Sequence, residues 1–160
     1  MLDQLINAAK GQLGDVISNQ GVTTDKLDYI AGISKDTLKE GVMDQVSSGN
    51  LDGIMNLFTG KEEATSGNPI VSSMISMFTQ KATSSLGLDD SKAGGIAAAV
   101  IPMVVQLVQS KFSGDDGADN GDLLSSLGLS GDGLMDKAKD LLGDKAKDLL
   151  GGKGLGNLFS

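Results

Sequence analysis

The chain has 160 residues, with 13 Lys, no Arg, 18 Asp and 3 Glu, which gives a formal net charge of −8. It contains no His, Cys or Trp, which excludes disulfides, thiol or imidazole chemistry and a zinc site built on His and Cys. The acidic balance and the absence of the guanidinium group argue against a nucleic-acid partner, because phosphate binding requires clustered basic residues. Hydrophobic residues make up 39% of the chain, enough for one core.

The N-terminal sequence, Met1 to Leu5, lacks the basic cluster of a signal peptide. The longest apolar run, Ala93 to Val108, is about 16 residues long, whereas a bilayer-spanning helix needs about 20. We therefore expect a cytoplasmic protein that has neither a membrane nor a nucleic acid as its partner.

Apolar residues recur at helical spacing along the chain, which predicts an all-α fold. The first stripe covers residues 2–17, and Gly21 is the expected stop after it. A second helical stretch, over 27–46, follows a predicted cap within Thr23–Asp25. The glycine and serine in Gly32–Ser34 could divide this stretch in two.

Two further helices begin at asparagine residues. Asn50 is expected to cap a short helix over residues 51–58. After a polar loop, Asn68 and Pro69 form a strong helix start, because Asn accepts from free amides and Pro suits the first helical position. The apolar stripe that follows leads to Gly87, a suitable residue for a helix C-terminus.

The last stretch of this part is apolar on almost every side, from Ala93 to Val108, behind a cap at Asp89–Ser91. Such a helix is expected to be buried on most faces, as the central helix of a bundle. Pro102 lacks a backbone donor and is expected to kink it near Ala98–Val100. We therefore predict a compact bundle of about five helices over residues 1–112.

The remaining chain has a different composition. Residues 113–133 are predicted to form a Gly/Asp-rich linker with a short helix over 122–128, and residues 134–160 an amphipathic tail. The tail contains the octad DKAKDLLG at 136–143, repeated without change at 144–151. A helix of this sequence is marginal alone and needs a surface on which to pack. We call its apolar positions the tail face, the candidate interaction face of the chain: Ala138, Leu141, Leu142, Ala146, Leu149, Leu150, Leu158 and Phe159.

Two segments carry a family resemblance. Leu86 to Ala93, followed by the Ala-rich Ile96 to Pro102, resembles the bacterial YidB-like domain of unknown function, and residues 122–129 are similar to that family's Gly/Leu-rich ending. Ser48-Gly49-Asn50 and the Asn68–Val71 motif are similar to segments of uncharacterised bacterial proteins. The resemblance implies a small all-α, homeodomain-like fold and no catalytic residues. The repetitive tail and the absence of Arg depart from the family pattern.

Two candidate sites have alternative interpretations. The acidic loop at 115–122 lacks two essential ligands of an EF-hand when Asp116 is placed first, so we predict no metal or cofactor and leave only weak divalent-cation binding open. Residues 68–108 could form a helix-turn-helix. Its second helix offers few base-reading side chains, namely Lys92, Gln106, Gln109 and Lys111.

The sequence therefore predicts a non-enzymatic helical interaction or self-assembly module, with a second copy or another protein as partner. No catalytic, cofactor-binding or metal-binding residue is predicted. The alternative is a nucleic-acid-associated homeodomain-like protein. A further alternative is a membrane- or envelope-associated helical protein that uses its apolar helix.

Overall fold

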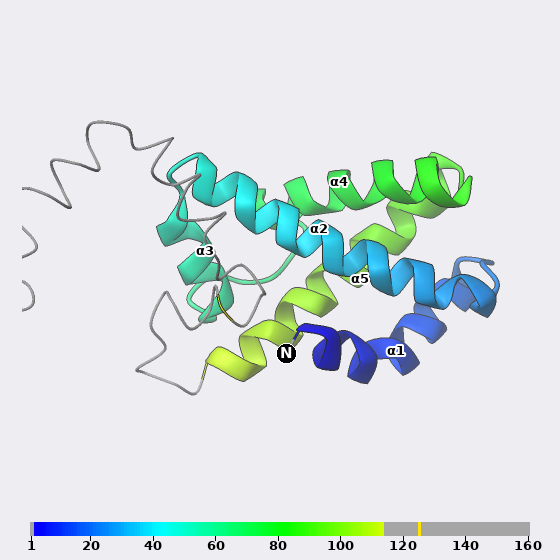
Figure 1. Cartoon of the computed structure of the whole chain (residues 1–160), viewed down its shortest axis with the longest axis horizontal. Helices are drawn as coiled ribbons and strands as arrows, with labels where there is room; N and C mark the ends of the chain where they lie inside the picture. The colour runs from blue at the N-terminus through cyan, green and yellow to red at the C-terminus, as the bar shows by residue number, and fades with distance from the viewer. Residues whose placement is uncertain (1, 114–124, 126–160) are drawn as a thin grey trace, which may run out of the picture.

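The computed structural model describes residues 2–113 and Ser125. The described residues contain no strand, and their helices form a compact all-α bundle, as predicted (Figure 1). In chain order the elements are α1 (Leu2–Asn19), a short 3-10 helix η1 (Thr24–Lys26), α2 (Leu27–Ser47), α3 (Leu51–Phe58), α4 (Pro69–Leu86) and α5 (Asp90–Phe112). The predicted linker and octad tail lie outside the described residues, apart from Ser113 and Ser125.

The α5 helix is the centre of the bundle and contacts each of the other four α-helices. It runs diagonally behind α2, with α1 on one side and α4 on the other (Figure 1). Its inward side consists of small and β-branched residues and the terminal phenylalanine, all almost completely buried: Ala93, Ile96, Ala97, Val100, Ile101, Val104, Val105, Val108 and Phe112. Burial of this stripe against four helices stabilises the single core.

Two predicted helix boundaries are confirmed in detail. The Asn68 side chain accepts hydrogen bonds from the amides of Ile70 and Val71, and Pro69 occupies the first position of α4. At the other end of α4, Gly87 adopts a left-handed conformation with φ of 64°, which a residue with a Cβ adopts only at a cost. The chain then enters α5, where Asp89 accepts from the Lys92 amide.

Three other expectations about boundaries are wrong. The α2 helix is continuous across Gly32–Ser34, because Gly32 is exposed in open space and the Ser34 hydroxyl donates to the Ile30 carbonyl within the helix at 2.7 Å. Thr23 precedes η1 without a side-chain capping bond. Asn50 precedes α3 without one as well, since its side chain donates to Gln45 Oε1 instead.

Candidate interaction site

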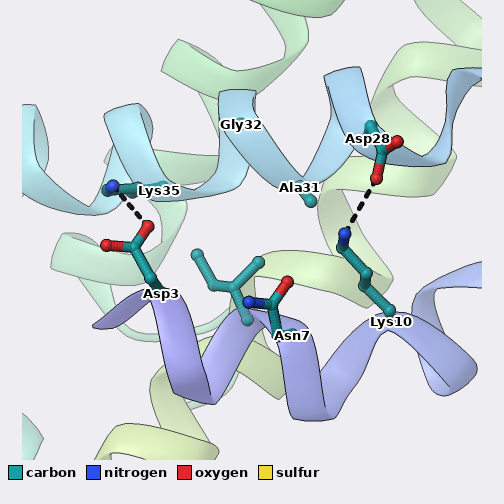
Figure 2. Close-up of a pocket in the computed structure, with 8 residues that line it drawn as sticks. Asp3, Asn7, Lys10, Asp28, Ala31, Gly32 and Lys35 are labelled. Carbon is teal, nitrogen blue, oxygen red and sulfur yellow. Dashed lines mark hydrogen bonds and ion pairs between the residues drawn. The ribbon is translucent and has the colours of Figure 1, made fainter. Parts of the chain in front are cut away.

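A pocket of about 270 Å³ lies between α1 and α2 and is open to solvent on one side. Its floor contains Ile6 and Ala31, both nearly buried, and the Asn7 amide stands between the two helices (Figure 2). Gly32 lies beside this floor, and a methyl group built on it would meet nothing within 4 Å. No site was expected here from the residue pattern alone.

The two ends of the pocket are closed by ion pairs between the same two helices (Figure 2). Lys10 Nζ lies 2.8 Å from Asp28 Oδ1 at one end, and Lys35 Nζ pairs with Asp3 Oδ1 at the other. The hydrogen bond from Lys35 lowers the pKa of the Asp3 carboxyl below its ordinary value. The side chains of Asp3 and Asp28 are 68% and 82% exposed, so each pair contributes little to stability.

The two ion pairs arise from a repeat of the same sequence pattern. The α1 helix begins with Leu2-Asp3, and Lys10 follows seven residues after the Asp. The same pattern recurs 25 residues later at the start of α2, as Leu27-Asp28 followed by Lys35. Burial follows the same 25-residue spacing, since each of these positions in α1 and its counterpart in α2 is buried: Leu5 and Ile30, Ile6 and Ala31, Ala9 and Ser34, Leu13 and Leu38, Ile17 and Val42. The helices run antiparallel, so the Asp of each copy meets the Lys of the other.

The charges that line this pocket are already satisfied within the protein. Each Lys has a carboxylate partner, and the residues between the pairs offer only one amide group and apolar surface. A site of this kind lacks a nucleophile or an unpaired charge with which to act on a substrate. The pocket is therefore best described as the open seam of a charge-paired helix hairpin.

The second feature is an uncovered side of α5. Ala98 and Ala99 are exposed, and Pro102 and Met103 are partly exposed; we call these four residues the α5 strip. No charged residue occurs between Lys92 and Lys111. The prediction that this helix is buried on most faces is confirmed, since between Ala93 and Val108 only Ala98, Ala99 and Gln106 are exposed and the other residues are buried or partly buried.

The α5 strip has defined limits along the helix. Towards the N-terminus, the Gln20 side chain lies over Gly95, and a Cβ on Gly95 would come within 2.6 Å of Gln20 Oε1. Towards the C-terminus, Gln106 donates to the Ala64 carbonyl at 3.4 Å. The strip is thus the gap between the end of α1 and the loop that precedes α4.

The middle of the α5 strip carries a backbone acceptor without a helical donor. In an α-helix the carbonyl of Ala98 would accept from the amide of residue 102. That residue is proline, which has no N–H. Because Ala98 is exposed, the carbonyl can be reached by a donor from outside the helix.

Other predicted site residues are placed as follows. Gln109 donates to the carbonyls of Leu57 at 2.6 Å and Glu62 at 3.0 Å, and Gln106 donates to Ala64, so both glutamines of the expected recognition helix bond to backbone carbonyls of the same bundle. The tail face and the acidic loop at 115–122 lie outside the described residues. Within residues 2–113, no three acidic side chains converge on a metal site.

The chain matches no family model, no curated protein and no solved structure. The resemblance to YidB-like domains therefore stays a prediction. Among the described helices, α5 alone is long and apolar enough to cross a membrane, and 44% of its most apolar window is buried. This is weak support for a membrane span, because the core helix of a folded bundle meets the same criterion.

Proposed function

We propose that this protein is a non-enzymatic helical interaction or self-assembly module. The observation that carries the proposal is the α5 strip: the described helix that is long and apolar enough to cross a membrane turns Ala98 and Ala99 towards solvent and keeps this side free of charge. Its counterpart is the tail face, defined above from Ala138 to Phe159, whose octads are expected from their sequence to need a surface on which to pack. Both features are typical of association through helix packing.

The charge of the chain supports a protein partner or a second copy. A net charge of −8 limits indiscriminate association and repels the phosphates of nucleic acids. Cytoplasmic location is part of the proposal, and no cofactor or metal is required by it. The paired charges between α1 and α2 leave the α5 strip as the surface best suited to a helical partner.

The test is the absolute mass of the full-length chain and of a 1–130 truncation, measured by light scattering across a hundredfold concentration range that ends near 1 mM. That range reaches the millimolar effective concentration of a tethered segment. We expect the full-length mass to rise above that of a 16.3 kDa monomer while the truncation stays monomeric. Two constant monomer masses would end the self-assembly proposal and leave only a heterologous partner.

A lipid surface is the second candidate partner, and the hydropathy of α5 is the observation that favours it. Flotation with neutral liposomes tests it. Recovery of the full-length protein with the vesicles, together with loss of recovery in Ala99→Glu, would replace the protein partner with a membrane. Failure of the protein to float removes this candidate.

A further inference from the structure

We infer that the α5 strip is the docking site for the octad segment, residues 136–151, of the same chain. The inference rests on the proposed function, in which the tail face is the interaction element. It adds that the tail face packs on the α5 strip and that the two belong to the same chain. Ala98 and Ala99 are small and exposed, so a second helix can approach the α5 backbone closely. Helix pairs pack with their axes about 8–10 Å apart, and small residues at the contact favour the lower end of this range.

The dimensions of the two elements agree. The distance along α5 from Gly95 to Gln106 is about 17 Å, at a rise of about 1.5 Å per residue. One octad in helical form covers about 12 Å and both cover about 24 Å by the same rise. The octad segment therefore spans the α5 strip together with the glutamines that limit it, Gln20 and Gln106.

The connection between the two elements has a suitable length. The chain leaves α5 at its C-terminal end, and the 22 residues 114–135 precede the octad segment. A flexible Gly-rich chain of this length has a root-mean-square span of about 26 Å. The middle of the α5 strip lies about 17 Å along the helix from Phe112, so the tether reaches it without being stretched.

The charge of the octad segment distinguishes it from the rest of the chain that follows α5. The two octads contain four Lys and four Asp and are neutral, so the whole net charge of −8 is carried by the other residues. The α5 strip is uncharged, with the nearest charged residues of its helix at Lys92 and Lys111. A neutral amphipathic segment can thus dock there without repulsion from the acidic bundle.

The free carbonyl of Ala98 adds a polar anchor to this apolar contact. On a helical projection of the octad segment, Lys139 and Lys145 flank the narrow stripe that four residues of the tail face form, namely Ala138, Leu142, Ala146 and Leu149. A lysine at the edge of a docked apolar face can donate to a carbonyl on the facing helix while its stem covers apolar surface. Pro102, which leaves this acceptor unpaired, is therefore part of the docking site.

Connectivity decides between the chain's own octads and those of a second copy. A short flexible tether holds the segment at an effective concentration in the millimolar range. At micromolar protein the intramolecular contact therefore prevails. Exchange of octads between chains begins only as the protein concentration approaches that range, which gives the self-association expected above.

Disulfide trapping tests this arrangement in the full-length protein, which has no native Cys. Ala99→Cys is combined with Leu142→Cys and, separately, with Leu149→Cys, so that either octad can be captured. The matched control places the first cysteine at Ser76, which is exposed on α4. Ser76 precedes the end of α4 by ten residues, and Ala99 follows the start of α5 by nine. Both sites therefore lie at a similar distance from the turn between α4 and α5.

At about 10 µM protein we expect at least one Ala99 pair to form an intramolecular disulfide about tenfold faster than its Ser76 control. Docking raises the effective concentration of the octad cysteine at Ala99, whereas at Ser76 the tether alone sets it. Equal rates for both Ala99 pairs and their controls would overturn the inference. A mixture of isotope-labelled and unlabelled chains distinguishes the source of the octads. Cross-linked products that join the two kinds of chain would assign the α5 strip to a second copy and overturn the intramolecular contact.

This result and the light-scattering result separate the two proposals. Specific trapping with a constant monomer mass would support docking and contradict self-assembly. A rising mass without specific trapping would leave self-assembly in place and move the docking site away from the α5 strip.

Discussion

Gly41 of α2 packs against Met74 of α4 so closely that a methyl group on Gly41 would come within 2.6 Å of Met74 Cγ. Both residues are buried, and Met74 is completely so. We expect Gly41→Ala to lower the free energy of unfolding by about 1–2 kcal/mol, because overpacking outweighs the gain in helix propensity. Urea denaturation followed by circular dichroism measures the change.

Gly14→Ala is the matched control for this prediction. Gly14 also lies inside a helix, α1, but a methyl group there would meet nothing within 4 Å. The same substitution is therefore expected to raise the free energy of unfolding by about 0.5–1 kcal/mol. A loss of stability in both variants would contradict the close approach of α2 and α4.

Thr37 is completely buried, and its hydroxyl is the buried side-chain oxygen without a hydrogen-bond partner in the described part of the chain. Thr37→Val keeps the shape and removes the unsatisfied group, so we expect the free energy of unfolding to rise by about 1 kcal/mol. Thermal unfolding compares it with Thr79→Val, whose hydroxyl donates to the Ile75 carbonyl at 2.8 Å. The free energy of unfolding of the control should not rise. An equal rise in both variants would show that the gain does not come from removing an unpaired hydroxyl at Thr37.

The two helix-starting asparagines are predicted to differ in their effect on stability. Asn68 accepts from two amides of α4 and donates to Glu62 at 2.8 Å, so Asn68→Ala should cost about 1 kcal/mol. Asn50→Ala removes no capping bond from α3 and should change stability by less than about 0.5 kcal/mol. Chemical denaturation of both variants decides the point, and equal losses would show that Asn50 also acts as a cap.

The Asp3–Lys35 pair makes a prediction about pH. Because the folded-state pKa of Asp3 is lowered, mainly by the hydrogen bond from Lys35, its contribution to stability is present above the unfolded-state pKa and is lost as pH falls through the folded-state value. Lys35→Gln should raise the pKa of Asp3 towards the ordinary value of about 3.9. A carboxyl-carbon NMR titration measures it, with Lys61→Gln as the control. An unchanged midpoint in Lys35→Gln would show that the pair does not form.

The sequence was sufficient to predict the helices but not the surfaces between them. Apolar periodicity and the Asn68-Pro69 start depend on residues close together in the chain, so they could be recognised directly. The free side of α5 could not, because burial of an alanine depends on which distant helices reach it. The ion pairs were missed although the repeated Asp-to-Lys spacing of seven residues was visible, since pairing requires the orientation of α1 against α2.

That spacing has a consequence for the relative direction in which α1 and α2 pack. Both helices carry Asp near the start and Lys two turns later, so antiparallel packing makes two attractive pairs, Asp3 with Lys35 and Lys10 with Asp28. If the helices ran parallel in the same register, Asp3 would face Asp28 and Lys10 would face Lys35, and both contacts would be repulsive. Pairs that add little to stability can thus still discriminate against the wrong topology, because reversing one helix changes the sign of both interactions at once.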